Sequence, residues 1–192
     1  SFLPDVIIWR SLKTFGIDDT DLKNKLPDMV GKGLNRLYDF QHEESGGWGW
    51  CEYGKDDLWM TAYVVYALIA ARDAGFAVNS DILNGGLGSL KQQLNADRTQ
   101  VEIAQDAEIY ALYVLSLAGQ HGAVNQHLPS LLGNPNPRPR ENALIAMTLA
   151  NTGDKNGAKN YLLRLWRQAK EAGNEIHWGA VTNHDYQAPT ET

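Results

Sequence analysis

Several features are scarce or missing in this sequence of 192 residues, and each absence narrows what the chain can be. A single cysteine, Cys51, allows no disulfide within the chain, so cysteine usage says nothing about the redox compartment. The net charge of -6 leaves no basic excess, which argues against nucleic acid or an anionic membrane surface as a partner. The longest apolar run, 62–71, is far shorter than the roughly 20 residues that span a bilayer.

The two ends of the sequence also lack familiar signals. Residue 1 is a serine, and residues 1–16 show neither the basic head nor the cleavage site of a signal peptide. The last five residues, 188–192, place a proline before Thr190 and Glu191, which is typical of a helix start. We therefore expect a piece of a longer protein, with residues 1–192 forming a single domain.

Helical periodicity covers most of the sequence, because apolar residues recur at spacings of three and four. In the segment 57–74 nearly every face is apolar, so this helix must be covered on all sides. Pro27 lies inside the second predicted helix, where it could kink or split it. The pattern predicts helices over 4–15, 18–41, 57–74, 80–94, 101 or 105 to 118, 123–132, 140–151 and 154–172, and a loop over 173–182.

An internal repeat links three of these helices. The segments 62–68, 111–117 and 143–149 each begin with alanine, carry a small residue at the sixth position and end in leucine. All-round apolar helices thus alternate along the chain with amphipathic ones. The alternation predicts an all-α fold, an α/α toroid of helical hairpins like that of terpenoid cyclases and protein prenyltransferases, here as an incomplete ring. An open α-solenoid is the alternative, but its inner helices would be more polar.

The amphipathic helices repeat as well, each followed by a loop with a tryptophan. The matching offsets are those of Leu34, Leu37 and Trp50 in the first half and of Leu162, Leu165 and Trp178 in the second. We therefore expect the tryptophans of the loop 41–55, Trp48 and Trp50, to wedge between outer and inner helices. The alternative is a ligand surface on which their rings act as stacking platforms.

Other candidate site residues have both a chemical and a structural interpretation. Cys51 as a nucleophile would need a neighbouring cation or helix N-terminus, whereas Asp56 and Asp57 nearby are acidic. This acid pair could bind a cation, but an N-cap and a first-turn acid of the helix 57–74 are expected. The histidines lack metal-ligand spacing on any helix. The tyrosines at i, i+3 spacing could line a cavity or lie in the core: Tyr63, Tyr66, Tyr110 and Tyr113.

The loop 41–55 and its flanks resemble two families. Gln41 and the run Gly46-Gly47-Trp48 resemble the glutamine–tryptophan repeat of squalene–hopene type terpene cyclases and the glycine-rich loops of protein prenyltransferases. A longer stretch, about 1–80, is similar to the thioester-containing domain of the α2-macroglobulin and complement C3 superfamily, above all to its bacterial members. The similar segments, in the same order, are Phe2-Leu3-Pro4, 26–37, 41–50, 57–64 and 70–75.

This resemblance implies a helical scaffold domain of a bacterial α2-macroglobulin-like broad-spectrum protease inhibitor. The family's Cys-x-Glu-Gln motif forms an internal thioester, which we expect just upstream of residue 1. Cys51 is followed by Glu52 and Tyr53 and is therefore not that cysteine. Residues 95–97 lack the histidine that directs some members to hydroxyls, which leaves amines as targets. The positions that match the family's structural motif are Gln41, Gly46, Gly47, Trp48, Trp50, Asp57, Trp59, Thr61 and Tyr63.

The resemblance further implies no catalytic residue, cofactor or metal ligand in this chain. Its implied partners are the other domains of the parent macroglobulin and, through the parent, target proteases, in the periplasm or outside the cell. The alternative is an enzyme of the terpene cyclase or prenyltransferase type that uses the toroid cavity; a toroid used only for protein contacts is a third possibility. We find no Asp-rich cyclase motif, and Gly49 stands where a zinc-binding Asp would precede Cys51.

Overall fold

The computed structural model describes the chain except for residues 1, 52, 97–103, 173–174 and 179–192. It contains two compact units, Ser1–Gly133 and Asn134–Thr192. The expectation of one domain over 1–192 stays a prediction. Within the described residues, no helix is both long and apolar enough to cross a membrane.

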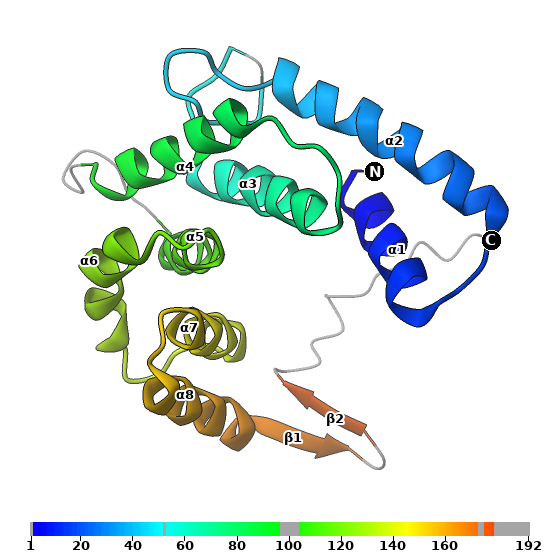
Figure 1. Ribbon diagram of the computed structural model, residues 1–192. Coiled ribbons are helices and arrows are strands. Elements are labelled where there is room, and N and C mark those ends of the chain that lie inside the picture. Colours follow the sequence, from blue (N-terminus) through cyan, green and yellow to red (C-terminus); the bar gives the residue numbers. More distant parts are fainter. Residues whose placement is uncertain (1, 52, 97–103, 173–174, 179–192) are drawn as a thin grey trace, which may run out of the picture. The chain divides into compact units, whose positions relative to one another are not determined.

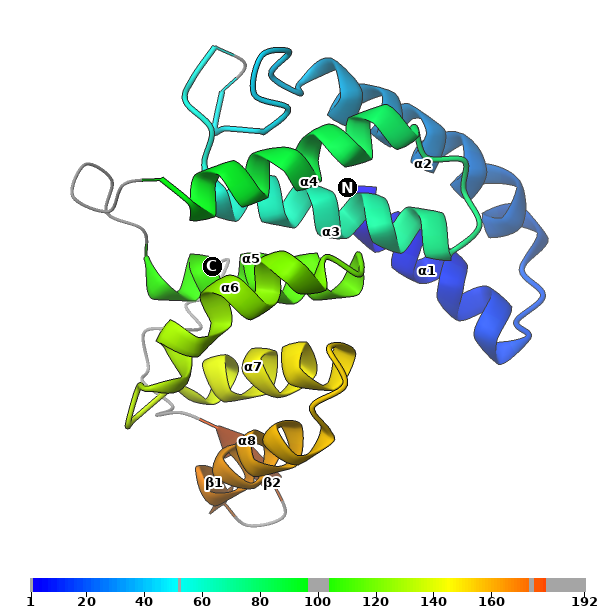
Figure 2. The same ribbon diagram turned by 60° about the vertical axis from the view of Figure 1, so that its left-hand side comes forward.

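The first unit consists of helices in two layers (Figure 1). The inner layer consists of α1, α3 and α5, in which α3 contacts both of the others. In the outer layer, α2 packs on α1 and α6 on α5, while α4 packs mainly on α3 and also touches α5. Figure 2 shows α3 lying between α4 and α5. The bounds are α1 Phe2–Phe15, α2 Thr20–Asp39, α3 Leu58–Asp73, α4 Ser80–Leu94, α5 Gln105–Leu117 and α6 His121–Leu132.

The burial of α3 and α5 explains their all-round apolar sequences. Val65 and Leu68 on α3 and Leu112 and Leu115 on α5 have no exposed side-chain surface. By contrast, α2 buries only one stripe, represented by Val30 and Leu34, and carries charged residues on its other faces. This difference is the alternation that the sequence predicts for inner and outer layers.

The second unit pairs two helices and ends in a β-hairpin. Helices α7 (Pro139–Asn151) and α8 (Lys155–Arg167) pack along each other. Strands β1 (Ala169–Ala172) and β2 (Glu175–Trp178) are antiparallel, with Ala169 opposite Trp178.

The all-α class and the helical hairpins are confirmed, with eight α-helices in the described residues. Pro27 neither splits nor ends α2, which continues through it to Asp39. Whether the hairpins make an incomplete ring stays a prediction.

The predicted helix 154–172 is wrong over its last residues, and the predicted loop 173–182 is wrong over 175–178; residues 173–174 and 179–182 lie outside the described residues. Helix α8 ends at Arg167, and β1 and β2 follow. The side chain of Gln168 donates to the carbonyl of Pro137 (2.8 Å) and accepts from Nδ2 of Asn142 (2.9 Å), which fixes the chain to α7 at the point where α8 ends. In the sequence, Gly173-Asn174 separates the strands, and this pair is a known hairpin signal that periodicity alone does not weigh.

Candidate functional site in the glycine–tryptophan loop

The loop between α2 and α3 turns at Gly46, which lies against α4. Gly46 has a φ of +70°, a conformation that residues other than glycine rarely adopt. A Cβ on Gly46 would lie 2.7 Å from the carbonyl of Gly85 in α4. The two backbones therefore meet directly, and this contact requires glycine at position 46.

Gln41 connects the same loop to α4 through its side-chain amide. Its Nε2 donates to the carbonyl of Gly46 at 2.7 Å and to the carbonyl of Ile82 at 2.9 Å. One side chain thus holds the loop closed on itself and joined to the following outer helix.

Trp48 is the buried anchor of the loop, with 2% of its surface exposed. Its indole Nε1 donates to the carbonyl of Leu37 at 2.8 Å, near the end of α2. Its backbone N–H donates to Oγ1 of Thr61 and its carbonyl accepts from the same hydroxyl, both at 3.0 Å. Trp48 therefore ties α2 to α3, as predicted for a wedge between outer and inner helices.

Trp50 does not behave as predicted. It is 77% exposed, and the bond that Trp178 makes to Leu165 has its counterpart in Trp48 rather than in Trp50. The bonded leucine and tryptophan are 11 residues apart in the first loop and 13 apart in the second. An alignment at equal spacing therefore matched Trp178 to Trp50 instead of to Trp48.

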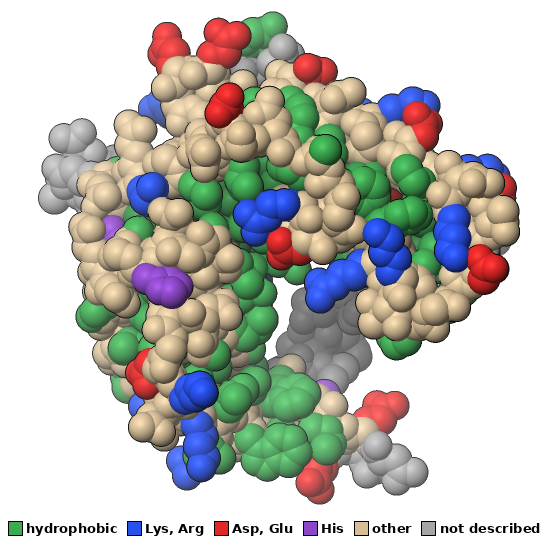
Figure 3. Space-filling view, in the orientation of Figure 1, with side chains coloured by type: hydrophobic (Ala, Val, Ile, Leu, Met, Phe, Trp, Pro, Cys, Tyr) green, Lys and Arg blue, Asp and Glu red, His purple; other side chains and the backbone are tan. Residues whose placement is uncertain are grey.

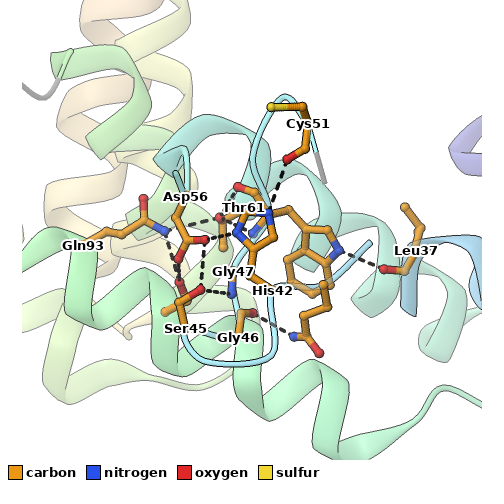
Figure 4. Close-up of polar contacts among 12 residues, drawn as sticks. Leu37, His42, Ser45, Gly46, Gly47, Cys51, Asp56, Thr61 and Gln93 are labelled. Atoms are coloured by element: carbon orange, nitrogen blue, oxygen red, sulfur yellow. Dashed lines mark hydrogen bonds and ion pairs between the residues drawn. The ribbon is translucent and has the colours of Figure 1, made fainter. Parts of the chain in front are cut away.

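Asp56 is the centre of a polar network beneath the loop (Figure 4). Its Oδ1 accepts from Nδ1 of His42 at 2.6 Å and from Oγ of Ser45 at 2.9 Å. Its Oδ2 accepts from Oγ of Ser89 on α4 at 2.9 Å. The side chains of His42 and Asp56 are each 15% exposed, so water screens this pair only weakly.

Gln93 extends the network from α4 to α3. Its Nε2 lies 3.2 Å from Oγ of Ser89 and 3.3 Å from Oγ1 of Thr61, the hydroxyl that holds the backbone of Trp48. Gly47 completes the packing, since a Cβ there would lie 2.3 Å from Oδ2 of Asp56 and 2.5 Å from Oγ of Ser89.

This arrangement does not constitute a nucleophile–base pair. Both serines donate to Asp56 rather than to His42, whereas catalysis by a serine requires the serine to donate to the histidine. The other ring nitrogen of His42 lies 3.4 Å from the carbonyl oxygen of Cys51, not from its thiol. Cys51 itself is an exposed residue. The geometry instead shows hydrogen bonds that join the loop to α3 and α4.

Three further predicted residues lie at the start of α3. Asp57 is the N-cap, and its carboxylate accepts from the N–H of Met60 at 2.8 Å. Trp59 packs on Tyr110 of α5 with ring centroids 4.7 Å apart, whereas Tyr63 is 41% exposed. Asp56, expected to share a capping role, instead holds the network described above.

The other predicted tyrosines form one cluster across α3 and α5. Tyr66 lies 6.4 Å from Tyr110 and 6.3 Å from Tyr113, measured between ring centroids. Burial raises the pKa of Tyr113 above its ordinary value, and the neighbouring Tyr66 adds to this effect.

The sequence interpretation missed His42, Ser45, Ser89 and Gln93. The sequence did contain one signal: Asp56 stands directly before Asp57, the N-cap of α3. A helix uses one N-cap acid, so a second acid that is partly buried needs hydrogen-bond donors from elsewhere in the chain. Among the described residues, no group of three or more His, Cys, Asp or Glu side chains is placed to hold a metal ion.

Comparison with known proteins indicates a relationship. No protein-family model matches the chain. The alpha-2-macroglobulin of Thermotoga maritima is 34% identical over 94 residues, which are 49% of this chain and 5% of that protein. The alpha-2-macroglobulin of Escherichia coli K12 is 34% identical over 76 residues, 39% of this chain and 4% of that protein. The chain resembles the bacterial alpha-2-macroglobulins.

Solved alpha-2-macroglobulin structures share the fold. Trypsin-activated alpha-2-macroglobulin from Escherichia coli superposes with a TM-score of 0.66 over 86% of this chain and 12% of that one, at 22% identity. Salmonella alpha-2-macroglobulin reacted with methylamine gives 0.64 over 85% of this chain and 11% of that one, at 20% identity. At these identities the likeness concerns the fold, and the chain spans only about one twentieth of its curated macroglobulin relatives.

Proposed function

We propose that this chain is the helical scaffold of a thioester-containing domain in a bacterial alpha-2-macroglobulin-like protease inhibitor. The observation that carries the proposal is the 34% identity over 94 residues to the Thermotoga maritima protein. The shared fold with the Escherichia coli protein over 86% of the chain supports it.

In this proposal the reactive group lies outside the residues described. A Cys-x-Glu-Gln motif just upstream of residue 1 would form the thioester, which acylates an amine of an attacking protease. Phe2, the first residue of α1, packs against Gly33 and lines a hollow of about 510 Å³ together with Trp50 and Met60. A segment that precedes Phe2 would therefore start beside this hollow, whose lining also includes the charged residues Asp5, Lys32 and Arg36.

The role proposed for the loop between α2 and α3 is to hold α2 and α3, which line this hollow, in fixed positions against α4. Gln41 and Asp56 bind α4, while Trp48 binds Leu37 of α2 and Thr61 of α3. The proposed partners are the other domains of the parent macroglobulin and the proteases that it traps. The proposed location is the periplasm or the cell exterior.

Two experiments test this function. The gene that encodes the chain should contain Cys-x-Glu-Gln within about a dozen codons before Ser1. The full-length protein should incorporate labelled methylamine at one glutamine, and pretreatment with a protease should abolish the incorporation. If the parent carries an Asp-rich motif and turns over an isoprenoid substrate, the enzyme alternative is correct and the proposal is wrong.

A further inference from the structure

A second hollow of about 510 Å³ lies at the first turns of α3 and α5, and we call it the α3–α5 hollow. The last turn of α4 also contributes to it, through Gln93, so the hollow belongs to the packed helices of the first unit. Much of its wall is apolar. The apolar residues of the lining are Leu58, Trp59, Ala96, Ala104 and Ala107.

The ring of Trp59 is a fixed part of this wall. It packs on Tyr110 with ring centroids 4.7 Å apart, and Tyr110 in turn lies 6.4 Å from both Tyr66 and Tyr113. The aromatic cluster of α3 and α5 therefore holds the indole in place. An aromatic ring in a partly dry wall attracts an ammonium group to its π face.

Two acceptor oxygens of the lining remain available to a ligand. Asp57 uses Oδ1 to accept from the N–H of Met60, and Gln93 uses Nε2 to donate to Ser89 and Thr61. Within the described part of the chain, Oδ2 of Asp57 and Oε1 of Gln93 accept no hydrogen bond. These two oxygens select a ligand group that donates hydrogen bonds.

The charges of the lining favour a cationic donor. Asp57 and Asp106 stand against one basic residue of the lining, Lys55, because Asp56 already serves the network under the loop. The N-terminal ends of α3 and α5 carry a partial positive charge that disfavours a cation. Asp57 and Asp106 lie at these two ends and offset that charge.

We propose that the α3–α5 hollow binds a primary alkylammonium group, the chemistry of a lysine side chain on a partner protein. The methylene stem lies against Leu58 and Ala96, and the ammonium donates to Oδ2 of Asp57 and Oε1 of Gln93 beside Trp59. A lysine side chain combines an apolar stem with a charged head. The hollow offers the matching combination of an apolar wall and two acceptors.

The site also has a position that suits the proposed function. The first turn of α3 contributes to two hollows, since Leu58 and Trp59 line the α3–α5 hollow while Met60 lines the hollow beside Phe2. A lysine held here would lie close to a thioester that precedes Phe2, and the site would concentrate the amines that the thioester acylates. This role rests on the proposed function, whereas binding of the ammonium group does not.

Other surfaces of the molecule define a ligand less well. Figure 3 shows hydrophobic side chains over α8, where Trp166 is 63% exposed, but an apolar surface alone does not specify a ligand. The hollow of about 770 Å³ next to Asp56 is lined mainly by acidic side chains such as Asp39, Glu43 and Glu44, and acidic residues alone do not define one either.

The test is to titrate the chain with n-butylammonium, which reproduces a lysine side chain from Cβ to Nζ. The indole N–H signal of Trp59 in a nitrogen–proton NMR spectrum reports binding, and the loss of one signal in Trp59→Phe assigns it. We expect saturable shifts with a dissociation constant of about 1–10 mM. Neutral 1-butanol has the same stem, and at equal ionic strength it should bind about fivefold more weakly or not at all.

Three variants locate the site. Asp57→Asn keeps an N-cap but removes the charge, so the fold should persist while n-butylammonium binds about fivefold more weakly. Ala96→Leu should abolish binding because its side chain fills the hollow. Ala77→Leu, on an exposed residue between α3 and α4, is the matched control and should bind as the unaltered chain does.

Several results would overturn the proposal. They are equal binding of n-butylammonium and 1-butanol, unchanged binding in Asp57→Asn, or a lack of saturation up to about 100 mM, well above the dissociation constant expected for so small a ligand. The titration needs no thioester, so its failure leaves methylamine incorporation by the full-length protein unaffected. Conversely, a parent without a thioester would leave the ammonium site intact.

Discussion

Oδ2 of Asp56 accepts a hydrogen bond from Oγ of Ser89 at 2.9 Å, across 33 residues of sequence. The bond joins the residue before the N-cap of α3 to the middle of α4, a helix that follows α3 in the chain. The same carboxylate binds His42 and Ser45 in the loop that follows α2, so one side chain connects this loop, the start of α3 and α4. Its removal should therefore affect the whole first unit.

Asp56→Ala should lower the free energy of unfolding by about 2–4 kcal/mol, since it removes charged hydrogen bonds and leaves partly buried donors without an acceptor. Urea denaturation followed by circular dichroism measures the loss. Asp73→Ala is the matched control, because Asp73 is 55% exposed and paired with Arg72 at the surface. This variant should change stability by no more than about 0.5 kcal/mol. Similar losses for both variants would contradict the assigned role of Asp56.

Two glycines of α4 should respond to alanine in opposite directions. Gly86→Ala should destabilise, since its Cβ would collide with Val65 and Trp48. Gly88→Ala should stabilise by about 0.5–1 kcal/mol, because glycine is a poor helix former and nothing lies within 4 Å of the new Cβ. Thermal unfolding of the two variants, made in parallel, gives the sign of each change. A gain in stability from Gly86→Ala would contradict the close approach of Trp48 to α4.

The two anchoring tryptophans should differ in how much they contribute to stability. Trp48→Phe removes a donor from a residue that is 2% exposed, so we expect a loss of about 1–3 kcal/mol. Trp178→Phe removes the same bond at a residue that is 44% exposed, where water can replace the indole N–H. Its cost should stay below about 1 kcal/mol. Chemical denaturation of both variants provides the comparison, and a cost at Trp178 as large as that at Trp48 would contradict the dependence on burial argued here.

Alkaline pH should destabilise the chain through Tyr113. Burial and Tyr66 raise the pKa of Tyr113 in the folded state, so the folded form holds its proton at pH values where the unfolded form has lost it. The contribution to stability is complete below the ordinary tyrosine pKa of about 10 and is lost as the pH rises through the folded value. Urea titrations at pH 8 and above pH 10 should show this loss, and Tyr113→Phe should reduce it. An unchanged loss in Tyr113→Phe would assign it to other groups.

The helices were predictable because burial leaves a periodic trace in the sequence. Val65 and Leu68 mark an inner helix and Leu34 an outer one, and the N-cap at Asp57 follows from its position before an apolar run. The network under the loop was not predictable, since Ser89 lies on another helix and no local pattern relates it to Asp56. The β-hairpin was missed because the amphipathic pattern of α8 continues past Gln168, whose bonds to Pro137 and Asn142 are tertiary.

The loop between α2 and α3 has an immobilised base and an accessible tip. Gly46, Gly47 and Trp48 are held by α3 and α4, whereas Cys51 and Tyr53 are exposed. Since Cys51 is the single thiol of the sequence, a fluorophore or spin label attached to it would occupy one site per chain. Its short connection to Trp48 would limit the positions that the label can reach. The native chain thus offers a ready spectroscopic reporter for distances to any neighbouring domain.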